Sequence, residues 1–267
     1  MKNILLILTC FNVTGATAQK QPLRKQRLIF SHGVGYSFAL NTLSVDPVID
    51  QLVAVNGKGV LLNFFTVNWF MKNNIGIEMR MQGLPGDNTQ KNRKKALELL
   101  IGDHFGDQYY YQSQYPVNPD QSDGFPGFAG LLGLTYKFER GRFSYIPKFY
   151  VGYMDVSGSS SYNDILKEKN TNTILSVRYQ GDPDLESAPV FGPAASVMYR
   201  FNSLVGIRAN ASYLWHKAGV RYERAITDLV TNNTAATYYS NEKTLHRIHI
   251  DLSIAVGFGR RGELVDK

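Results

Sequence analysis

The sequence predicts an all-β protein, namely an eight-stranded antiparallel up-and-down transmembrane β-barrel with four long external loops. Three observations support this fold class. Apolar and polar residues alternate along most of the chain, the connections between the alternating segments are short and long in turn, and the chain begins with a segment typical of export. Strands with one apolar face, connected in this way, are typical of barrels that cross a membrane.

The first 18 residues have the build of a secretory signal peptide. One positive charge at Lys2 precedes the apolar run 4–8, and small residues end the segment with an A-x-A site at Ala16 and Ala18. The apolar run is much shorter than the ~20 residues that a membrane-spanning helix needs, so we expect cleavage after Ala18. Because Cys10 is removed with this segment, we expect no disulfide and no thiolate site in the mature chain.

Cleavage leaves 249 of the 267 residues (267 − 18), enough for one large all-β domain. Loss of Lys2 leaves 28 Lys and Arg against 22 Asp and Glu, a net charge of +6 (28 − 22). In an exported protein the expected counter-ions are anionic lipid and lipopolysaccharide, and no nucleic acid is expected. The predicted divisions are a signal peptide over 1–18, a periplasmic N-terminal lead-in over 19–29, the outer-membrane β-barrel over 30–258 and a short C-terminal tail over 259–267.

Eight segments carry the period-two alternation of an extended strand. The clearest runs from Phe128 to Phe138 and is followed, after a turn at 139–142, by a second from Phe143 to Tyr153. Most segments reach the ~9 to 11 residues that a tilted strand needs to cross a bilayer. The expected strands are 30–43, 60–71, 75–82, 128–138, 143–153, 191–201, 205–215 and 245–258.

The lengths of the connections discriminate most strongly between fold classes. Three are short turns, near 72–74, 139–142 and 202–203, whereas four are long, near 44–57, 83–125, 157–188 and 217–243. Outer-membrane barrels have short periplasmic turns and long external loops. We therefore expect both ends of the barrel to lie on the periplasmic side.

The strand faces opposite the apolar ones carry charged and polar residues. A soluble sandwich would bury the apolar faces and expose these residues, whereas a membrane barrel turns them inward. The signal peptide, the unequal loops and the aromatic residues near strand ends, such as Trp69, Phe70 and Trp215, favour the membrane barrel. The expected interior polar network is Glu78, Arg80, Lys148, Arg200, Arg208, Arg247, His249 and Asp251.

This pattern resembles the small eight-stranded outer-membrane barrel proteins of Gram-negative bacteria, of the type common in Bacteroidetes and similar to an OmpA-like transmembrane barrel without a periplasmic domain. The resemblance covers residues 30–258 as a pattern and includes no diagnostic motif. It implies a terminal aromatic residue that the barrel-assembly machinery recognises. Phe258 fits that signal, but nine residues follow it, a departure from the family's pattern.

Eight strands enclose an interior that side chains fill, so an open diffusion channel is not expected. The inward charges fit a structural network of ion pairs and hydrogen bonds, because buried charges are retained when they are paired. Their excess of positive charge leaves a second interpretation open, a narrow anion-conducting barrel.

The long connection 83–125 carries a basic cluster and several tyrosines. Asn88 or Thr89 is a candidate N-cap of a short helix that Gly102 would end. Cations in the first turns of a helix are disfavoured by its dipole, so an external anion such as a lipid A phosphate is a candidate partner, with a solvated basic loop as the alternative. The candidate anion or lipopolysaccharide contacts are Lys91, Arg93, Lys94 and Lys95.

Catalysis has weaker support. The candidate groups for a lipid A modifying enzyme are His249, Asp251 and Ser253 on the last strand, with Asp103 and His104 in the second long loop. Neither G-x-S-x-G nor H-E-x-x-H is present. We therefore expect a non-enzymatic barrel with no catalytic residue, no cofactor and no metal, which acts through its external loops in a structural, binding or accessory role, as in a surface or secretion assembly.

Overall fold

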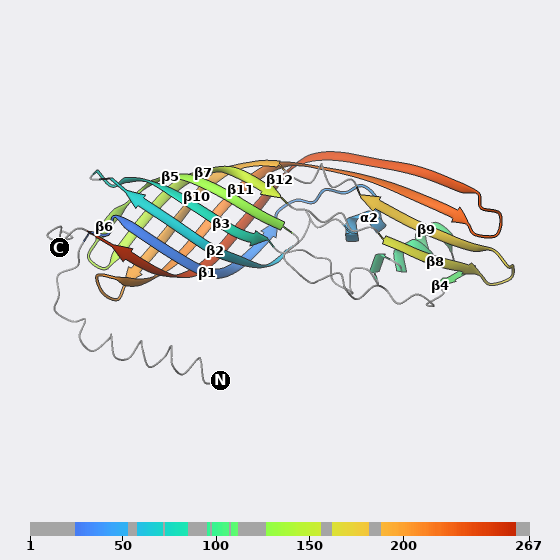
Figure 1. Ribbon diagram of the computed structural model, residues 1–267, viewed down its shortest axis with the longest axis horizontal. Coiled ribbons are helices and arrows are strands. Elements are labelled where there is room, and N and C mark those ends of the chain that lie inside the picture. The colour runs from blue at the N-terminus through green and yellow to red at the C-terminus, as the bar shows by residue number, and fades with distance from the viewer. Residues whose placement is uncertain are drawn as a thin grey trace, which may run out of the picture.

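The structure is a computed structural model that describes residues 25–52, 58–71, 73–84, 95–96, 98–106, 108–111, 127–155, 162–181 and 188–259. Its main feature is a closed ring of eight antiparallel strands in the order β10-β7-β5-β3-β2-β1-β12-β11, which closes by pairing β10 with β11 (Figure 1). The ring consists of β1 (Leu28–Ala39), β2 (Gly59–Phe70), β3 (Ile75–Leu84), β5 (Gly127–Tyr136), β7 (Phe143–Asp155), β10 (Ala188–Arg200), β11 (Val205–Asp228) and β12 (Thr234–Phe258). The predicted eight-stranded barrel is confirmed.

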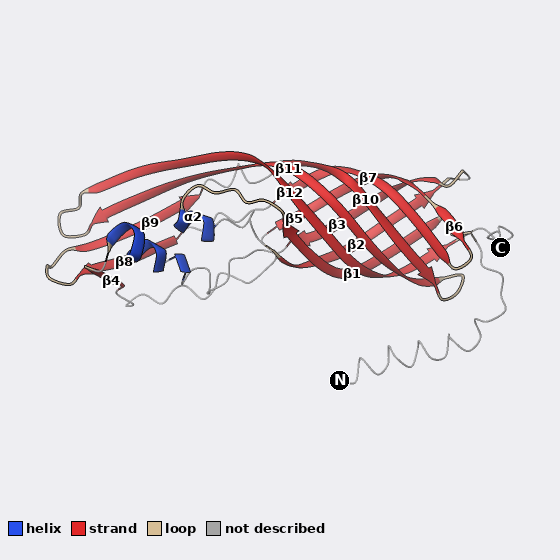
Figure 2. Ribbon diagram, turned by 180° about the vertical axis from the view of Figure 1, so that it is seen from behind, coloured by secondary structure: helices blue, strands red, loops and turns tan. Residues whose placement is uncertain are grey.

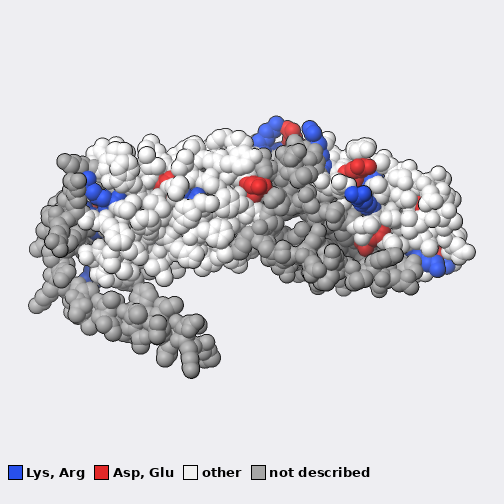
Figure 3. Space-filling view, in the orientation of Figure 1, with Lys and Arg blue, Asp and Glu red and all other residues white. Residues whose placement is uncertain are grey.

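The polar and apolar faces of the ring are inverted relative to those of a soluble protein. The outward side chains of Leu134 and Leu252 are 67% and 56% exposed, whereas the inward side chains of Arg80 and Lys148 are almost fully buried. Figure 3 shows few charged atoms on the barrel wall. An apolar exterior around a polar interior is stable only in lipid, so this barrel spans a membrane, as barrels of the bacterial outer membrane do.

The short turns lie together at one end of the barrel. Asn74 adopts a left-handed conformation (φ 65°) between β2 and β3, and Gly141 does so (φ 57°) before β7. The turn predicted at 139–142 is tighter than expected, because β6 (Phe138–Arg140) pairs with the start of β7. The first residues of β1 and the last of β12 lie at this same end, which is the periplasmic end by the length of its connections (Figure 1).

At the opposite end the chain forms an ordered extracellular sheet in place of two of the predicted long loops. Strands β11 and β12 continue as a pair far beyond the barrel, up to Thr227 and Thr234, so 217–243 is a β-hairpin. Strands β8 (Tyr162–Glu168) and β9 (Ile174–Gly181) form a second hairpin within the predicted loop 157–188. With β4 (Tyr109–Tyr111) the sheet order is β4-β8-β9-β11-β12.

Short helical segments lie beside this sheet (Figure 2). Asp46 accepts the N–H groups of Val48 (2.9 Å) and Ile49 (3.4 Å) and thereby begins α2 (Pro47–Leu52). In the second long loop, residues 95–96 and 98–99 are helical, and the latter pair continues into the π-helical turn η2 (Leu100–Phe105). No helix among the described residues is long and apolar enough to cross a membrane.

The end of this second helical segment differs from the prediction. Gly102 lies inside η2, and the chain leaves the helix at Gly106, whose φ is 69° and whose N–H donates to the carbonyl of Ile101 (2.6 Å). The positive φ of Gly106, which glycine adopts without a steric cost, ends the helix here, which is the role expected of Gly102. The candidate N-caps Asn88 and Thr89 lie outside the described residues.

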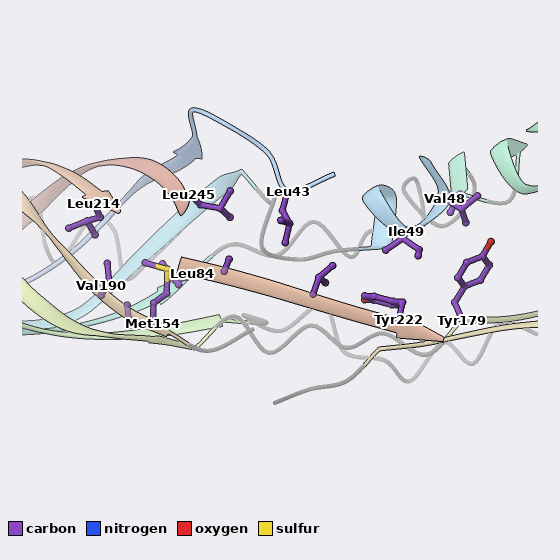
Figure 4. Close-up of a cluster of buried hydrophobic side chains, with 14 of the residues drawn as sticks. Leu43, Val48, Ile49, Leu84, Met154, Tyr179, Val190, Leu214, Tyr222 and Leu245 are labelled. Carbon is purple, nitrogen blue, oxygen red and sulfur yellow. The ribbon is translucent and has the colours of Figure 1, made fainter. Parts of the chain in front are cut away.

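One apolar cluster connects the barrel to the extracellular sheet. Figure 4 shows it running from Leu214, Val190 and Met154 inside the barrel to Ile49 and Tyr179 beside the sheet. Its members inside the outer half of the lumen are Leu61, Leu84, Ala129, Leu131, Met154, Val190, Leu214, Ala218 and Leu245. The lumen is therefore apolar in its outer half, above the polar residues described next.

Candidate functional site

The interior polar network begins on β3, whose inward residues are Glu78, Arg80 and Gln82. The alternation of the strand directs their outward neighbours Ile77 and Met79 to lipid, and all three inward side chains are at most 2% exposed. Because the three residues lie at successive levels along the barrel axis, each meets partners from other walls of the barrel.

The carboxylate of Glu78 is held from several sides. Lys148 Nζ of β7 lies 3.0 Å from both of its oxygens, and Arg208 Nη2 of β11 lies 2.6 Å from one. The hydroxyl of Tyr150 and the amide of Asn68 donate to it as well. Because β7 and β11 are not neighbours of β3 in the ring, these ion pairs cross the lumen.

Asp251 of β12 anchors a second group. Arg80 forms an ion pair with it across the lumen, and Asn210 Nδ2 and Ser253 Oγ each donate to it at 3.0 Å. Arg80 also donates from Nε to the Oε1 atom of Gln82 at 3.0 Å. The two carboxylates of the central lumen are thus fully engaged in ion pairs and hydrogen bonds.

The candidate catalytic residues on the last strand, which the structure describes, do not form a triad with one another. His249 is fully buried, and its Nδ1 lies 3.0 Å from the side-chain nitrogen of Gln82, while Asp251 binds Arg80, Asn210 and Ser253. A catalytic histidine requires both an acid that orients it and access to the substrate. Asp103 and His104 lie in η2, and their side chains are outside the described set.

Arg200, which the sequence places in the interior polar network, is fully buried. It lies at the periplasmic mouth, where Nη1 is 3.5 Å from Glu139 and Nη2 donates to the carbonyl of Gly141 at 3.0 Å. Glu139 also pairs with Lys137 at 3.2 Å. An apolar layer formed by Ile29, Phe70, Ile146, Met198 and Ala255 separates this mouth cluster from Glu78.

Phe70, predicted as an aromatic residue of the membrane interface, belongs to this apolar layer inside the lumen. It is 1% exposed, and the ammonium of Lys137 lies 4.6 Å from its ring centroid, whereas the adjacent Trp69 is 56% exposed on the outer wall. Adjacent residues of a strand face opposite sides, so only one of the two can contact lipid.

Towards the outer half of the lumen the network ends in three basic groups. Arg247 Nη1 donates to the hydroxyl of Ser37 at 3.2 Å, and His249 lies one inward step closer to the periplasm on the same strand. His216 of β11, which the sequence pattern did not single out, is 0% exposed and is paired with Leu245 and Val190. The sequence alternation could have identified it, because residue 216 is an even number of positions from the inward-facing Arg208 and Leu214.

The basic cluster of the second long loop is only partly described. Lys91, Arg93 and Lys94 lie outside the described residues, and Lys95 is exposed at the first described helical position. A described basic group at the outer rim is Lys217, which pairs with Glu242. The hydrogen bond from Lys217, together with its charge, lowers the pKa of the Glu242 carboxyl.

Comparisons with known proteins add little to this geometry. No family model and no curated protein matches the chain. Similar solved structures include a major outer membrane protein from Thermus thermophilus, 11% identical over 86% of this chain and 99% of that one, with a TM-score of 0.37. OprG from Pseudomonas aeruginosa and the outer membrane protease OmpT from Escherichia coli are each 8% identical over 90% of this chain and 99% of the other, with a TM-score of 0.35. The barrel assignment rests on the strand register and the inverted faces.

Proposed function

We propose that this protein is a non-enzymatic outer-membrane barrel that binds a partner protein at the cell surface through its extracellular sheet, in an accessory role within a surface or secretion assembly. The observation that carries the proposal is the outer edge of β12. Within the described part of the chain, residues 234–240 of β12 pair with β11 alone, because β1 pairs with β12 only from Arg247 onward.

The register identifies which backbone groups are available at this edge. Asp228 donates its N–H to the carbonyl of Asn233 at 2.9 Å, so the backbone groups of 233, 235, 237 and 239 point toward β11. Those of Thr234, Ala236, Tyr238 and Ser240 point away from it. An open edge of this kind is a template on which an extended segment of another protein adds as a further strand.

The side chains along this edge suit such a partner. Tyr238 is 76% exposed, and Tyr239 packs its ring against Arg224, whose Cζ lies 5.3 Å from the ring centroid. Exposed tyrosines contribute large contact areas at interfaces at a low cost in conformational entropy. Nearer the membrane the edge is already covered, since Leu40 donates to the carbonyl of His246 at 2.7 Å and Asn41 to that of Thr244 at 2.9 Å.

The lumen favours binding over conduction. Ion pairs from Glu78 to Lys148 and Arg208 cross its centre, and apolar side chains fill the levels on both sides of them. A permeating anion would have to pass fully buried leucine and phenylalanine side chains without water, which is costly for a charge. The narrow anion-conducting barrel is therefore the weaker candidate.

Site-specific photo-crosslinking in intact cells tests the proposal. A benzophenone side chain at Tyr238 should give a discrete protein adduct, and the same group at the lipid-facing Leu252 serves as the control. If Tyr238 gives no adduct, or both positions give the same ladder, the extracellular edge has no protein partner.

The lipid A modifying enzyme is tested separately. Mass spectrometry of lipid A should be the same with and without the protein, and His249→Ala and His104→Ala should change nothing. An altered lipid A would replace the binding proposal with the enzymatic one. Neutralising Lys91, Arg93, Lys94 and Lys95 should weaken lipopolysaccharide binding in vitro, and unchanged binding would remove these residues as contacts.

Recognition by the barrel-assembly machinery has one structural support. The ring of Phe258 is half exposed on the outer wall at the periplasmic end and makes an edge contact with Phe30, with centroids 6.2 Å apart. Such a side chain is accessible to an assembly factor before the barrel closes. The signal peptide and the Bacteroidetes-type relationship remain predictions, and residues 1–24 lie outside the described chain.

A further inference from the structure

We propose that the lumen encloses a binding site for one small inorganic anion, such as chloride, formed by His216, Arg247 and His249. The three side chains are each 0% exposed, and they lie at the boundary between the ionic network and the apolar outer half of the lumen. The register places them together. His216 pairs with Leu245, so Arg247 is its diagonal neighbour on β12, and His249 follows at the next inward position.

Ring nitrogens without a hydrogen-bond partner are the first observation that points to a ligand. Neither nitrogen of His216 has a partner among the described residues, and Nε2 of His249 also has none. Buried polar groups in folded proteins are almost always hydrogen-bonded, because an unsatisfied one loses its hydration without compensation. His216 lies between Val190 and Leu245, which offer its ring no hydrogen bond.

The hydrogen-bond network around His249 defines the kind of ligand. Arg80 donates to Oε1 of Gln82 at 3.0 Å, which orients the amide so that its nitrogen faces Nδ1 of His249, also at 3.0 Å. Nδ1 is therefore the acceptor, and the ring hydrogen of neutral His249 is on Nε2. This donor, the guanidinium of Arg247 and a ring N–H of His216 make a set that an anion satisfies and a cation does not.

The charge of the lumen agrees with this assignment. The buried charged residues that the structure describes between the periplasmic mouth and the outer half are the cations Arg80, Lys148, Arg208 and Arg247 and the carboxylates Glu78 and Asp251. Four positive and two negative charges leave +2 (4 − 2), with the histidines neutral. Ions removed from water require a counter-charge nearby, and a single bound anion supplies half of it. A water molecule would satisfy the nitrogens but would leave the charge unchanged.

Bromide distinguishes an anion from water. The full-length protein is folded and crystallised with bromide as the only halide, and an anomalous difference peak is expected among His216, Arg247 and His249. His216→Leu places an apolar side chain of similar size between Val190 and Leu245. Because leucine has no N–H donor, the anomalous peak should disappear. Lys217→Gln, which removes a positive charge from the exposed neighbouring position, should retain it. A wild-type crystal with only water-level density and no anomalous peak overturns the proposal.

A measurement in solution tests whether the anion binds at concentrations below those used for crystallisation. Unfolding of the barrel is followed in detergent with bromide or with the larger anion gluconate at equal ionic strength. When bromide exceeds its Kd by about tenfold, binding to the folded state should shift the folding equilibrium about tenfold. The shift should be absent in His216→Leu and present in Lys217→Gln. Equal shifts in all three proteins would assign the effect to bulk salt, and no shift in the wild type would show that the folded protein binds no bromide; either result overturns the proposal.

Discussion

The guanidinium of Arg208 lies 2.6 Å from the carboxylate of Glu78, although their strands β11 and β3 are separated by β12, β1 and β2 in the ring. Lys148 on β7 pairs with the same carboxylate, so the ion pairs of Glu78 connect β3, β7 and β11 across the lumen. A pair of charges buried across a lumen holds the strands in register only while both charges are present, because each neutralises the other out of water.

Glu78→Gln should therefore destabilise the barrel strongly. The change leaves Lys148 and Arg208 without the carboxylate that balances them, and breaking a buried pair in this way costs about 3 to 5 kcal/mol. Urea unfolding in lipid vesicles measures the loss. Glu242→Gln is the matched control, since its pair with Lys217 is mostly exposed and its loss should leave stability unchanged. Equal stabilities of Glu78→Gln and the wild type would show that the pairs do not hold the walls together.

A charge on the outer wall should also be costly, because that wall contacts lipid. Leu252→Arg places a guanidinium on the barrel segment of β12, and such a change near the bilayer midplane costs about 2 to 4 kcal/mol. Thr237→Arg, on the extracellular part of the same strand, should be tolerated. The readouts are unfolding in vesicles and the difference in electrophoretic mobility between heated and unheated protein. Tolerance of both changes would indicate that Leu252 does not contact lipid.

Gly35 of β1 should resist substitution because of the close approach of β12. A Cβ at this position would lie 2.1 Å from the carbonyl oxygen of Ile250 and 2.5 Å from Cβ of Asp251. Gly35→Ala should force the two strands apart beside the Arg80–Asp251 pair and lower the yield of heat-modifiable barrel. Gly130→Ala is the control, since no heavy atom lies within 4 Å of a Cβ there. Equal yields would contradict this account.

The extracellular sheet should loosen at high pH before the barrel does. Burial raises the pKa of Tyr179 on β9 from 10.0 to about 12. An unfolded sheet would release this proton near pH 10 while the folded sheet keeps it, so stability present below pH 10 declines as pH rises toward 12. Tyrosinate absorbance should show this late ionisation, and Tyr179→Phe should lack it and lose less stability over that range. Loss of the barrel's mobility shift at the same pH as the sheet would contradict separate stabilities.

The faces of most strands could be predicted from the sequence, because side chains that alternate along a strand must point to opposite sides. Glu78, Arg80 and Lys148 lie inward for this reason. On β2 the alternation between inward and outward side chains is interrupted, because the register shifts between Asn63 and Phe65. A bulge inserts one residue and reverses which face the following side chains occupy, so Phe70 points into the lumen.

The extracellular strands could not be predicted in this way. Residues 234–238 and 240–244 of β12 are exposed on both faces, so burial imposes no apolar period on them. What holds them is the ladder to β11, whose backbone hydrogen bonds have no signature in side-chain type. A segment without alternation resembles a loop in sequence, so the sequence predicts a loop over the β12 part of 217–243.

By itself, the sequence determined that this protein is built from eight membrane-length strands with one apolar face each, because local alternation and connection length require no knowledge of distant contacts. Only the tertiary structure decided which charges meet. Arg80 forms an ion pair with Asp251 although 171 positions separate them. Arg200, which also points into the lumen, pairs instead with Glu139 at the periplasmic mouth. The partner of an inward charge depends on its level along the axis, which closure of the ring sets through the register of every strand.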